Sequence, residues 1–114
     1  MAFTYKEVGN AKAVGTTYVL VGAGTSGRKV QAMAHVANLT ASAVNLRLYI
    51  ADTSWSSGEP TGGTLVDTLA YDVSIPANGV AGVGPFHIAG TNEVVVRAGT
   101  AASLDVHVFG VEES

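Results

Sequence analysis

Apolar and polar residues alternate with a period of two along most of the chain, which is the pattern of strands that pack one face on a core. The clearest example is residues 44–51, where Leu46 and Leu48 are predicted to face inward and Arg47 to face the opposite side. No long stretch keeps the period of an amphipathic helix. Seven strands are predicted, at residues 17–21, 30–37, 44–51, 65–75, 81–88, 93–98 and 104–111.

Two of these strands have an inner face that the pattern defines residue by residue. In the last strand this face carries Leu104, Val106 and Val108, and in residues 65–75 it carries Leu65, Leu69, Tyr71, Val73 and Ile75. The same alternation places His35 and His107 next to inward-facing residues, so both histidines are predicted to face outward.

Residues with turn chemistry separate the predicted strands. Asn78-Gly79 tolerates positive φ angles, which favours a tight turn before the strand at residues 81–88. About seven or eight short strands at this spacing predict an all-β fold, an antiparallel β-sandwich of the jelly-roll or immunoglobulin-like kind. Residues 1–15 lack the alternation and are predicted to be an N-terminal arm, with the sandwich domain at residues 16–114.

One short motif has the spacing of a dinucleotide-binding turn. The strand-like residues 19–21 lead into GAGTSG, with glycines at 22, 24 and 27. Such a site needs a helix after the third glycine, because the pyrophosphate binds at the N-terminus of that helix. The next residues, RKVQAMAHVAN, alternate with a period of two instead. The motif is therefore interpreted as a flexible hairpin loop, in which Gly24→Ala should have a modest effect.

Composition and net charge limit the number of domains and the kinds of partner that the protein could have. The 114 residues are enough for one domain with one core, and only 13% of them are charged, which favours a surface that a partner covers. The net charge of −3 indicates no binding to nucleic acid or to an anionic membrane. The chain has no cysteine, and we expect neither a transmembrane segment nor a secretory signal.

Candidate catalytic and metal-binding residues are sparse. His35, His87 and His107 lack partners at short ligand spacing and are interpreted as surface residues. The serines lie outside any nucleophile-elbow context, and the acidic residues do not form a calcium-binding loop pattern. The sequence therefore predicts a protein that is not an enzyme, with no catalytic residue, no cofactor and no metal.

Two segments outside the strand pattern are predicted to contact a partner. Residues 52–63, DTSWSSGEPTGG, form the longest polar loop and contain the only tryptophan, which could instead pack back on the sandwich edge. Residues 1–15 are expected to become ordered only against a neighbouring subunit, because ordering an isolated arm costs conformational entropy. The candidate contact residues are Phe3, Tyr5, Lys6, Lys12, Asp52, Trp55 and Glu59.

Three stretches carry a resemblance to a known group of proteins: HVANLTASAVNLRLYIAD, VSIPANGVAGVG and EVVVRAGTAASLDVHVFGVEES. In their turn residues they resemble the small β-rich structural proteins of tailed-bacteriophage virions. The resemblance covers residues 16–113 and rests on an AN-x-T turn, an IPA turn, an AG turn and a final L-D-V-x-V strand. It departs from the common pattern at residues 22–24, where a Pro-Ala-Gly turn is more typical, and in the longer loop at residues 52–63.

This resemblance implies a head decoration, or cement, protein that binds the assembled capsid shell and stabilises it. Its expected partners are the major capsid protein or other virion subunits, together with copies of itself, and a trimer is the expected oligomer. It would be made in the bacterial host cytoplasm and end in the virion. The alternatives are a tail- or fibre-associated protein, or a carbohydrate- or receptor-binding sandwich in which Trp55 stacks on a sugar and Asp52 or Glu59 accepts its hydroxyl groups.

Overall fold

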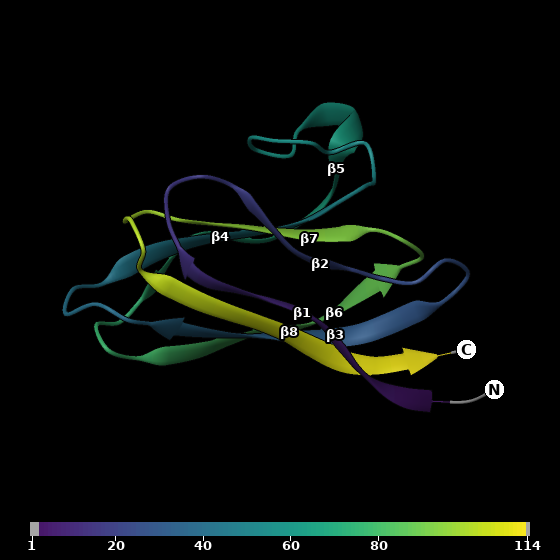
Figure 1. The fold of residues 1–114 in the computed structure, drawn as a ribbon, viewed down its shortest axis with the longest axis horizontal. Helices are drawn as coiled ribbons and strands as arrows, with labels where there is room; N and C mark the ends of the chain where they lie inside the picture. Colours follow the sequence, from purple (N-terminus) through teal and green to yellow (C-terminus); the bar gives the residue numbers. More distant parts are fainter. Residues whose placement is uncertain (1–2, 114) are drawn as a thin grey trace.

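The computed structural model describes residues 3–113 and contains eight β-strands and one short 3₁₀ turn (Figure 1). The strands are β1 (Phe3–Val14), β2 (Val19–Ala23), β3 (Lys29–Asn38), β4 (Val44–Ala51), β5 (Leu65–Ile75), β6 (Val80–Ala89), β7 (Glu93–Ala98) and β8 (Leu104–Glu113), and the 3₁₀ turn is η1 (Gly62–Thr64). All seven predicted strands are confirmed, with ends within two residues of the prediction. Within the described residues, no helix is long and apolar enough to cross a membrane.

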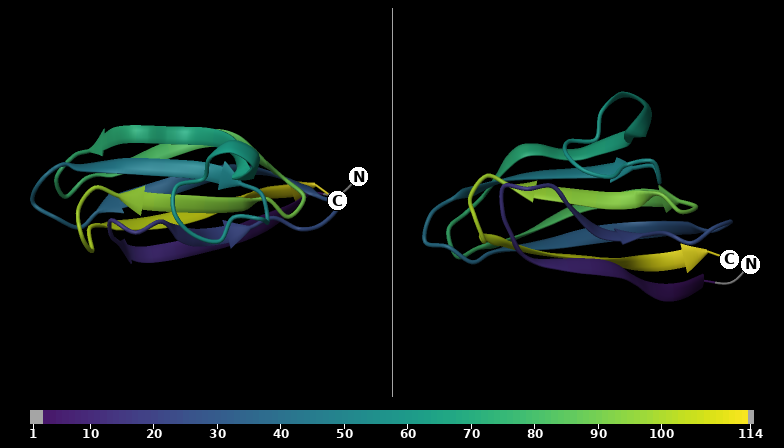
Figure 2. Two further views of the ribbon diagram at one scale, coloured as in Figure 1. Left: turned by 90° about the horizontal axis from the view of Figure 1, so that it is seen from above. Right: turned by 45° about the horizontal axis from the view of Figure 1, so that its top comes forward.

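The strands form one antiparallel sheet in the order β5-β4-β7-β2-β1-β8-β3-β6. This sheet folds over between β2 and β1 into two stacked layers (Figure 2). We call β1-β8-β3-β6 layer I and β2-β7-β4-β5 layer II. The predicted antiparallel β-sandwich is confirmed, and this division of eight strands is that of a jelly roll rather than an immunoglobulin-like stack.

Residues 3–14 do not form the predicted arm, because they are the strand β1 of layer I. This strand pairs with β8 from Phe3 opposite Glu113 to Val14 opposite Leu104. Its register shifts twice, which breaks the period of two, and most of its side chains are exposed. Backbone hydrogen bonds to β8 therefore hold this strand in the sheet. Because they do not depend on side chains, β1 needs no alternation of apolar and polar residues, and the sequence pattern could not reveal it. Met1 and Ala2, also assigned to the arm, lie outside the described residues.

The core lies between the two layers and comes from alternate positions of their strands. Val44, Leu46, Leu48 and Ile50 of β4 are all buried, as predicted, and so are Leu104, Val106 and Val108 of β8. The prediction for β5 was partly wrong, since Ile75 is buried but Tyr71 and Val73 are 56% and 44% exposed. The reason is local: β5 is an edge strand, its register against β4 shifts three times, and Asp72 has a positive φ of 53°.

Glycine allows the fold-over between the layers. The only registered pair between β1 and β2 is Gly9 opposite Gly22, and a Cβ atom on either would overlap a carbonyl oxygen of the other strand. The motif at residues 22–27 connects two strands without a helix, as predicted, but it is not a hairpin loop. Instead it crosses from layer II to layer I. A Cβ atom on Gly24 would overlap the carbonyl oxygen of Gly90, so Gly24→Ala should be more damaging than the sequence suggested.

Candidate functional site

The segment at residues 52–64, which we call the strap, covers the outer face of layer II. A hydrogen bond of 2.9 Å from the Asp52 N–H to the Thr64 carbonyl closes its base. Beneath it, Tyr49, Ala51 and Val95 are at most 2% exposed although they are not part of the central core. The strap therefore buries apolar side chains that would otherwise face solvent on this layer.

One carboxylate oxygen attaches the strap to layer II. Oε2 of Glu59 accepts hydrogen bonds from the hydroxyl groups of Tyr18 and Tyr49, both at 2.9 Å, and from Nη1 of Arg47 at 3.0 Å. The bonds from Tyr18 and Tyr49 lower the pKa of Glu59, and burial together with the bond to Glu59 raises the pKa of Tyr49. The Glu59 carboxylate thus bonds to side chains of the protein itself and holds the strap against layer II.

Arg47 also donates from Nη1 to the hydroxyl oxygen of Tyr18 at 3.2 Å, and its other donors bond to Asp72 of β5. Its Nε and Nη2 atoms lie 2.8 and 3.1 Å from the two oxygens of Asp72, and these hydrogen bonds lower the pKa of that carboxyl group. The guanidinium carbon also lies 4.2 Å from the ring centre of Tyr71. Such bidentate pairing leaves the cation few free donors, so this network is a structural one.

The other two candidate residues of the strap are bonded within it. The Asp52 carboxylate accepts hydrogen bonds from the backbone N–H and the hydroxyl group of Ser54, which lower the pKa of Asp52. The indole N–H of Trp55 donates to the Gly58 carbonyl at 2.7 Å. The structure therefore brings Asp52, Trp55 and Glu59 into one segment, where their polar groups maintain the shape of the strap.

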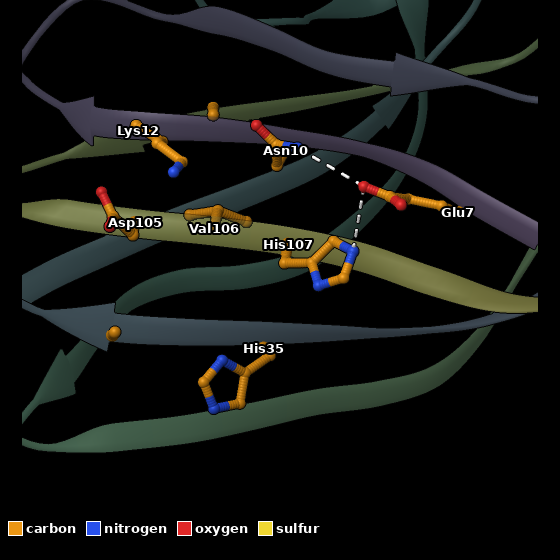
Figure 3. Close-up of a pocket in the computed structure, with 9 residues that line it drawn as sticks. Glu7, Asn10, Lys12, His35, Asp105, Val106 and His107 are labelled. Carbon is orange, nitrogen blue, oxygen red and sulfur yellow. Dashed lines mark hydrogen bonds and ion pairs between the residues drawn. The ribbon is translucent and has the colours of Figure 1, made fainter.

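The candidate residues of β1 separate into two groups. Phe3 and Tyr5 are each 65% exposed on the outer face of layer I, and Lys12 lines a hollow on the same face (Figure 3). Lys6 instead lies at the end of the sandwich, where its Nζ atom is 3.5 Å from Glu112 and 3.0 Å from the Thr25 hydroxyl group. Lys6 therefore links the loop between β2 and β3, which contains Thr25, to Glu112 of β8.

Glu112 is the buried carboxylate at this end of the sandwich, and the sequence did not single it out. It is 8% exposed and accepts a hydrogen bond of 3.1 Å from Arg28. The side chains of Thr25, Arg28 and Lys6 lower the pKa of Glu112. Because three neighbours surround this carboxylate, the cluster closes the end of the core rather than presenting a site to solvent.

The outer face of layer I contains a hollow beside β1, β3 and β8. This hollow of about 330 Å³ is lined by Glu7, Asn10, Lys12, His35, Asp105 and His107, among others (Figure 3). His35 and His107 are cross-strand neighbours on β3 and β8, and both side chains are partly exposed, which confirms the predicted outward direction. His107 Nε2 lies 3.4 Å from a carboxylate oxygen of Glu7. Among residues 3–113, no group of three or more histidine or acidic side chains is arranged to hold a metal ion.

A second exposed region follows the unpaired edges of β5 and β6, which are the two ends of the strand order. Its apolar side chains are Val66, Tyr71 and Val73 of β5 and Val80 of β6, which are between 44% and 63% exposed. We call these four residues the edge patch. The period-two pattern could not reveal it, because that pattern does not show which strands lack a neighbour.

Comparison with models of known protein families and with curated proteins finds no match to this sequence.

Proposed function

We propose that this protein is a structural component of a tailed-bacteriophage virion, a head decoration protein that binds the assembled capsid shell. The resemblance of its turn residues to such proteins supports this proposal, and so does the jelly-roll fold, which is widespread among capsid domains. The observation that carries it is the edge patch. A subunit whose role is to cover a neighbour needs a surface of this kind.

Unpaired strand edges attract other strands, and proteins that stay monomeric protect them with charges, bulges or covering loops. In β5 the protection is partial: Asp67 and Asp72 are acidic, and the register shifts against β4. Val66 and Tyr71 remain about half exposed beside them. Exposed apolar side chains along an unpaired strand edge favour pairing of that edge with another chain.

The mechanism of stabilisation is binding linkage. A protein that binds the assembled lattice and not the free capsid subunit lowers the free energy of the lattice alone, so dissociation of the shell must first break these contacts. An interface of about 800 Å² on each partner is typical of one specific contact. In a cyclic trimer the edge patches of three subunits would act together, which multiplies the effect through avidity.

The test combines copy number with rebinding. Quantitative gel analysis of purified virions should find hundreds of copies for a head protein, whereas a few dozen would indicate the tail or a fibre, and absence from virions would contradict the proposal. Val66→Asp should abolish rebinding to particles stripped of the protein, because it places a charge in the edge patch. Leu39→Asp is the matched control, since Leu39 is also about half exposed but lies in the loop between β3 and β4. Equal rebinding of both variants would exclude the edge patch.

A further inference from the structure

The outer face of layer I contains three hollows that follow one another along β8. Their volumes are about 240, 450 and 330 Å³, and they are lined in turn by β8 residues 111 and 113, residues 109–111, and residues 105–107. The first two share Gln31 and Val111. The second and third share no lining residue, but β1, β8 and β3 line all three, and β6 lines the first two. We call this row of hollows the groove. On layer II the strap lies over the outer face, where Tyr49, Ala51 and Val95 are buried.

The middle hollow is apolar and flanked by aromatic rings. Tyr5 and Phe109 contribute two rings from neighbouring strands, and Met33 and Pro85 extend the apolar surface towards β6. An exposed tyrosine ring presents a flat apolar surface to solvent at little conformational cost, since its side chain has only two rotatable bonds. This hollow therefore suits a flat apolar surface on a ligand.

On the β6 side of the groove, a glycine leaves room for the side chain of Met33. Gly84 has a φ of 129°, and a Cβ atom there would lie 3.0 Å from the sulfur of Met33. A Cβ atom on Gly82 would lie 3.7 Å from the terminal carbon of the same side chain. The second distance is an ordinary van der Waals contact, so the missing side chain of Gly84 is what gives Met33 room to lie over β6.

The two outer hollows are polar and offer both donors and acceptors. One contains the carboxylates of Glu7 and Asp105 beside the amide of Asn10, and the other contains the amide of Gln31 between Lys29 and Glu113. A hydroxyl group donates one hydrogen bond and accepts others, so it can bond to a carboxylate and to an amide or ammonium group at once. The groove thus alternates hydrogen-bonding groups with an aromatic surface.

We infer that this groove binds a neutral oligosaccharide, with one sugar ring stacked between Tyr5 and Phe109 and the hydroxyl groups of adjoining rings bonded to Glu7, Asn10 and Asp105. The inference goes beyond the proposed shell contact and uses a different surface. A sugar ring has flat C–H faces and a rim of hydroxyl groups, which matches the order of surfaces along the groove. A row of three hollows fits a chain of several rings, and their volumes are close to those of small-molecule sites.

Charge and shape argue against two other occupants. Three carboxylates and two lysines line the groove, so with neutral histidines it has a slight negative charge and does not favour an anionic ligand such as a nucleic acid. A second copy docking by two-fold symmetry would present the same hollowed face. Two concave faces would leave unfilled space between them, whereas protein interfaces pack as densely as interiors.

The test begins with the full-length protein on a printed array of neutral and charged glycans, followed by titration calorimetry with each neutral hexasaccharide that is retained. At least one neutral glycan should be retained. Tyr5→Ala and Phe109→Ala should each weaken its binding by about tenfold or more, since they remove the stacking surface. Tyr71→Ala is the matched control, because Tyr71 is a similarly exposed tyrosine on layer II and its loss should leave the affinity unchanged. Circular dichroism establishes that the variants fold.

Three outcomes would overturn the inference: retention of no neutral glycan, retention of charged glycans only, or equal binding by the Tyr5→Ala and Tyr71→Ala variants. Light scattering adds a fourth, since an oligomer that Tyr5→Ala dissociates would identify this face as a subunit interface. The test is independent of the proposed decoration function. Val66→Asp should leave glycan binding intact, and Tyr5→Ala should leave rebinding to virions intact, so either proposal can fail alone.

Discussion

Glu59 makes the strap sensitive to pH through a single carboxylate oxygen. Hydrogen bonds from Tyr18 and Tyr49 lower its pKa in the folded protein below the ordinary value of 4.5. A carboxyl group whose folded pKa is depressed stabilises the fold above its unfolded pKa, and this stabilisation is lost as the pH falls through the folded pKa. The strap should therefore loosen in acid before the core unfolds.

We expect acidification from about pH 7 to pH 3 to change the fluorescence of Trp55, which lies in the strap, ahead of global unfolding. In Glu59→Gln the neutral amide cannot replace the carboxylate as an acceptor of three bonds, so the strap should already be loose at neutral pH and this part of the acid transition should be absent. Fluorescence and circular dichroism, recorded together against pH, measure both events. Glu113→Gln at the end of β8 is the control, and an unchanged acid transition in Glu59→Gln would contradict the assignment.

At the scale of elements, β1 shows how a strand can be stable without an apolar pattern. Its partner β8 lies at the other end of the chain, and their pairing extends over most of both strands. Removing residues 1–12 would expose the backbone groups of β8 and remove the strand that connects the two layers. Exposed aromatic side chains of β1, by contrast, contribute little to the core.

Deletion of residues 1–12 should therefore abolish cooperative unfolding, because β8 would lose its backbone partners on one side. Tyr5→Ala and Phe3→Ala keep the backbone of β1, and since both side chains are 65% exposed, each should change the free energy of unfolding by only about 0.5 kcal/mol. Urea denaturation followed by circular dichroism compares the three variants. A truncated protein that unfolds cooperatively at the full-length midpoint would restore the arm interpretation.

For the whole molecule, the topology determines the expected folding rate. Layer I pairs Phe3 with Glu113, and β3 pairs with β8, so most of the chain must be brought together before this layer is complete. Sheets built from such distant pairs fold slowly, because loop-closure entropy is lost before the contacts form.

We expect refolding to take from milliseconds to seconds, as in other sandwiches with distant strand pairs. Stopped-flow fluorescence of Trp55 after dilution from urea measures the rate. The Glu59→Gln variant separates strap docking from formation of the sandwich, since loss of the strap's attachment should alter the Trp55 signal more than the rate measured by far-ultraviolet circular dichroism. Folding in microseconds would show that local contacts dominate.

Much of the fold could be predicted from the sequence, and the reason is visible in particular strands. Leu46, Leu48 and Arg47 lie on the faces that the alternation predicts, because β4 has strand neighbours on both sides and packs one face on the core. The candidate contact residues were predicted less well. Asp52 and Glu59 are polar loop residues in the sequence, and nothing local shows that their carboxylates bond within the protein.

The sequence by itself determined seven of the eight strands and most turns, because alternation and turn chemistry act over a few neighbouring residues. The tertiary structure alone decided which strands became neighbours. That choice made residues 3–14 a strand, exposed Tyr71 and Val73 on an edge, attached the strap to layer II through Glu59, and left a row of hollows along β8. The physical reason is that these features depend on contacts between residues far apart in the chain, as far as Phe3 from Glu113, and no local pattern encodes them.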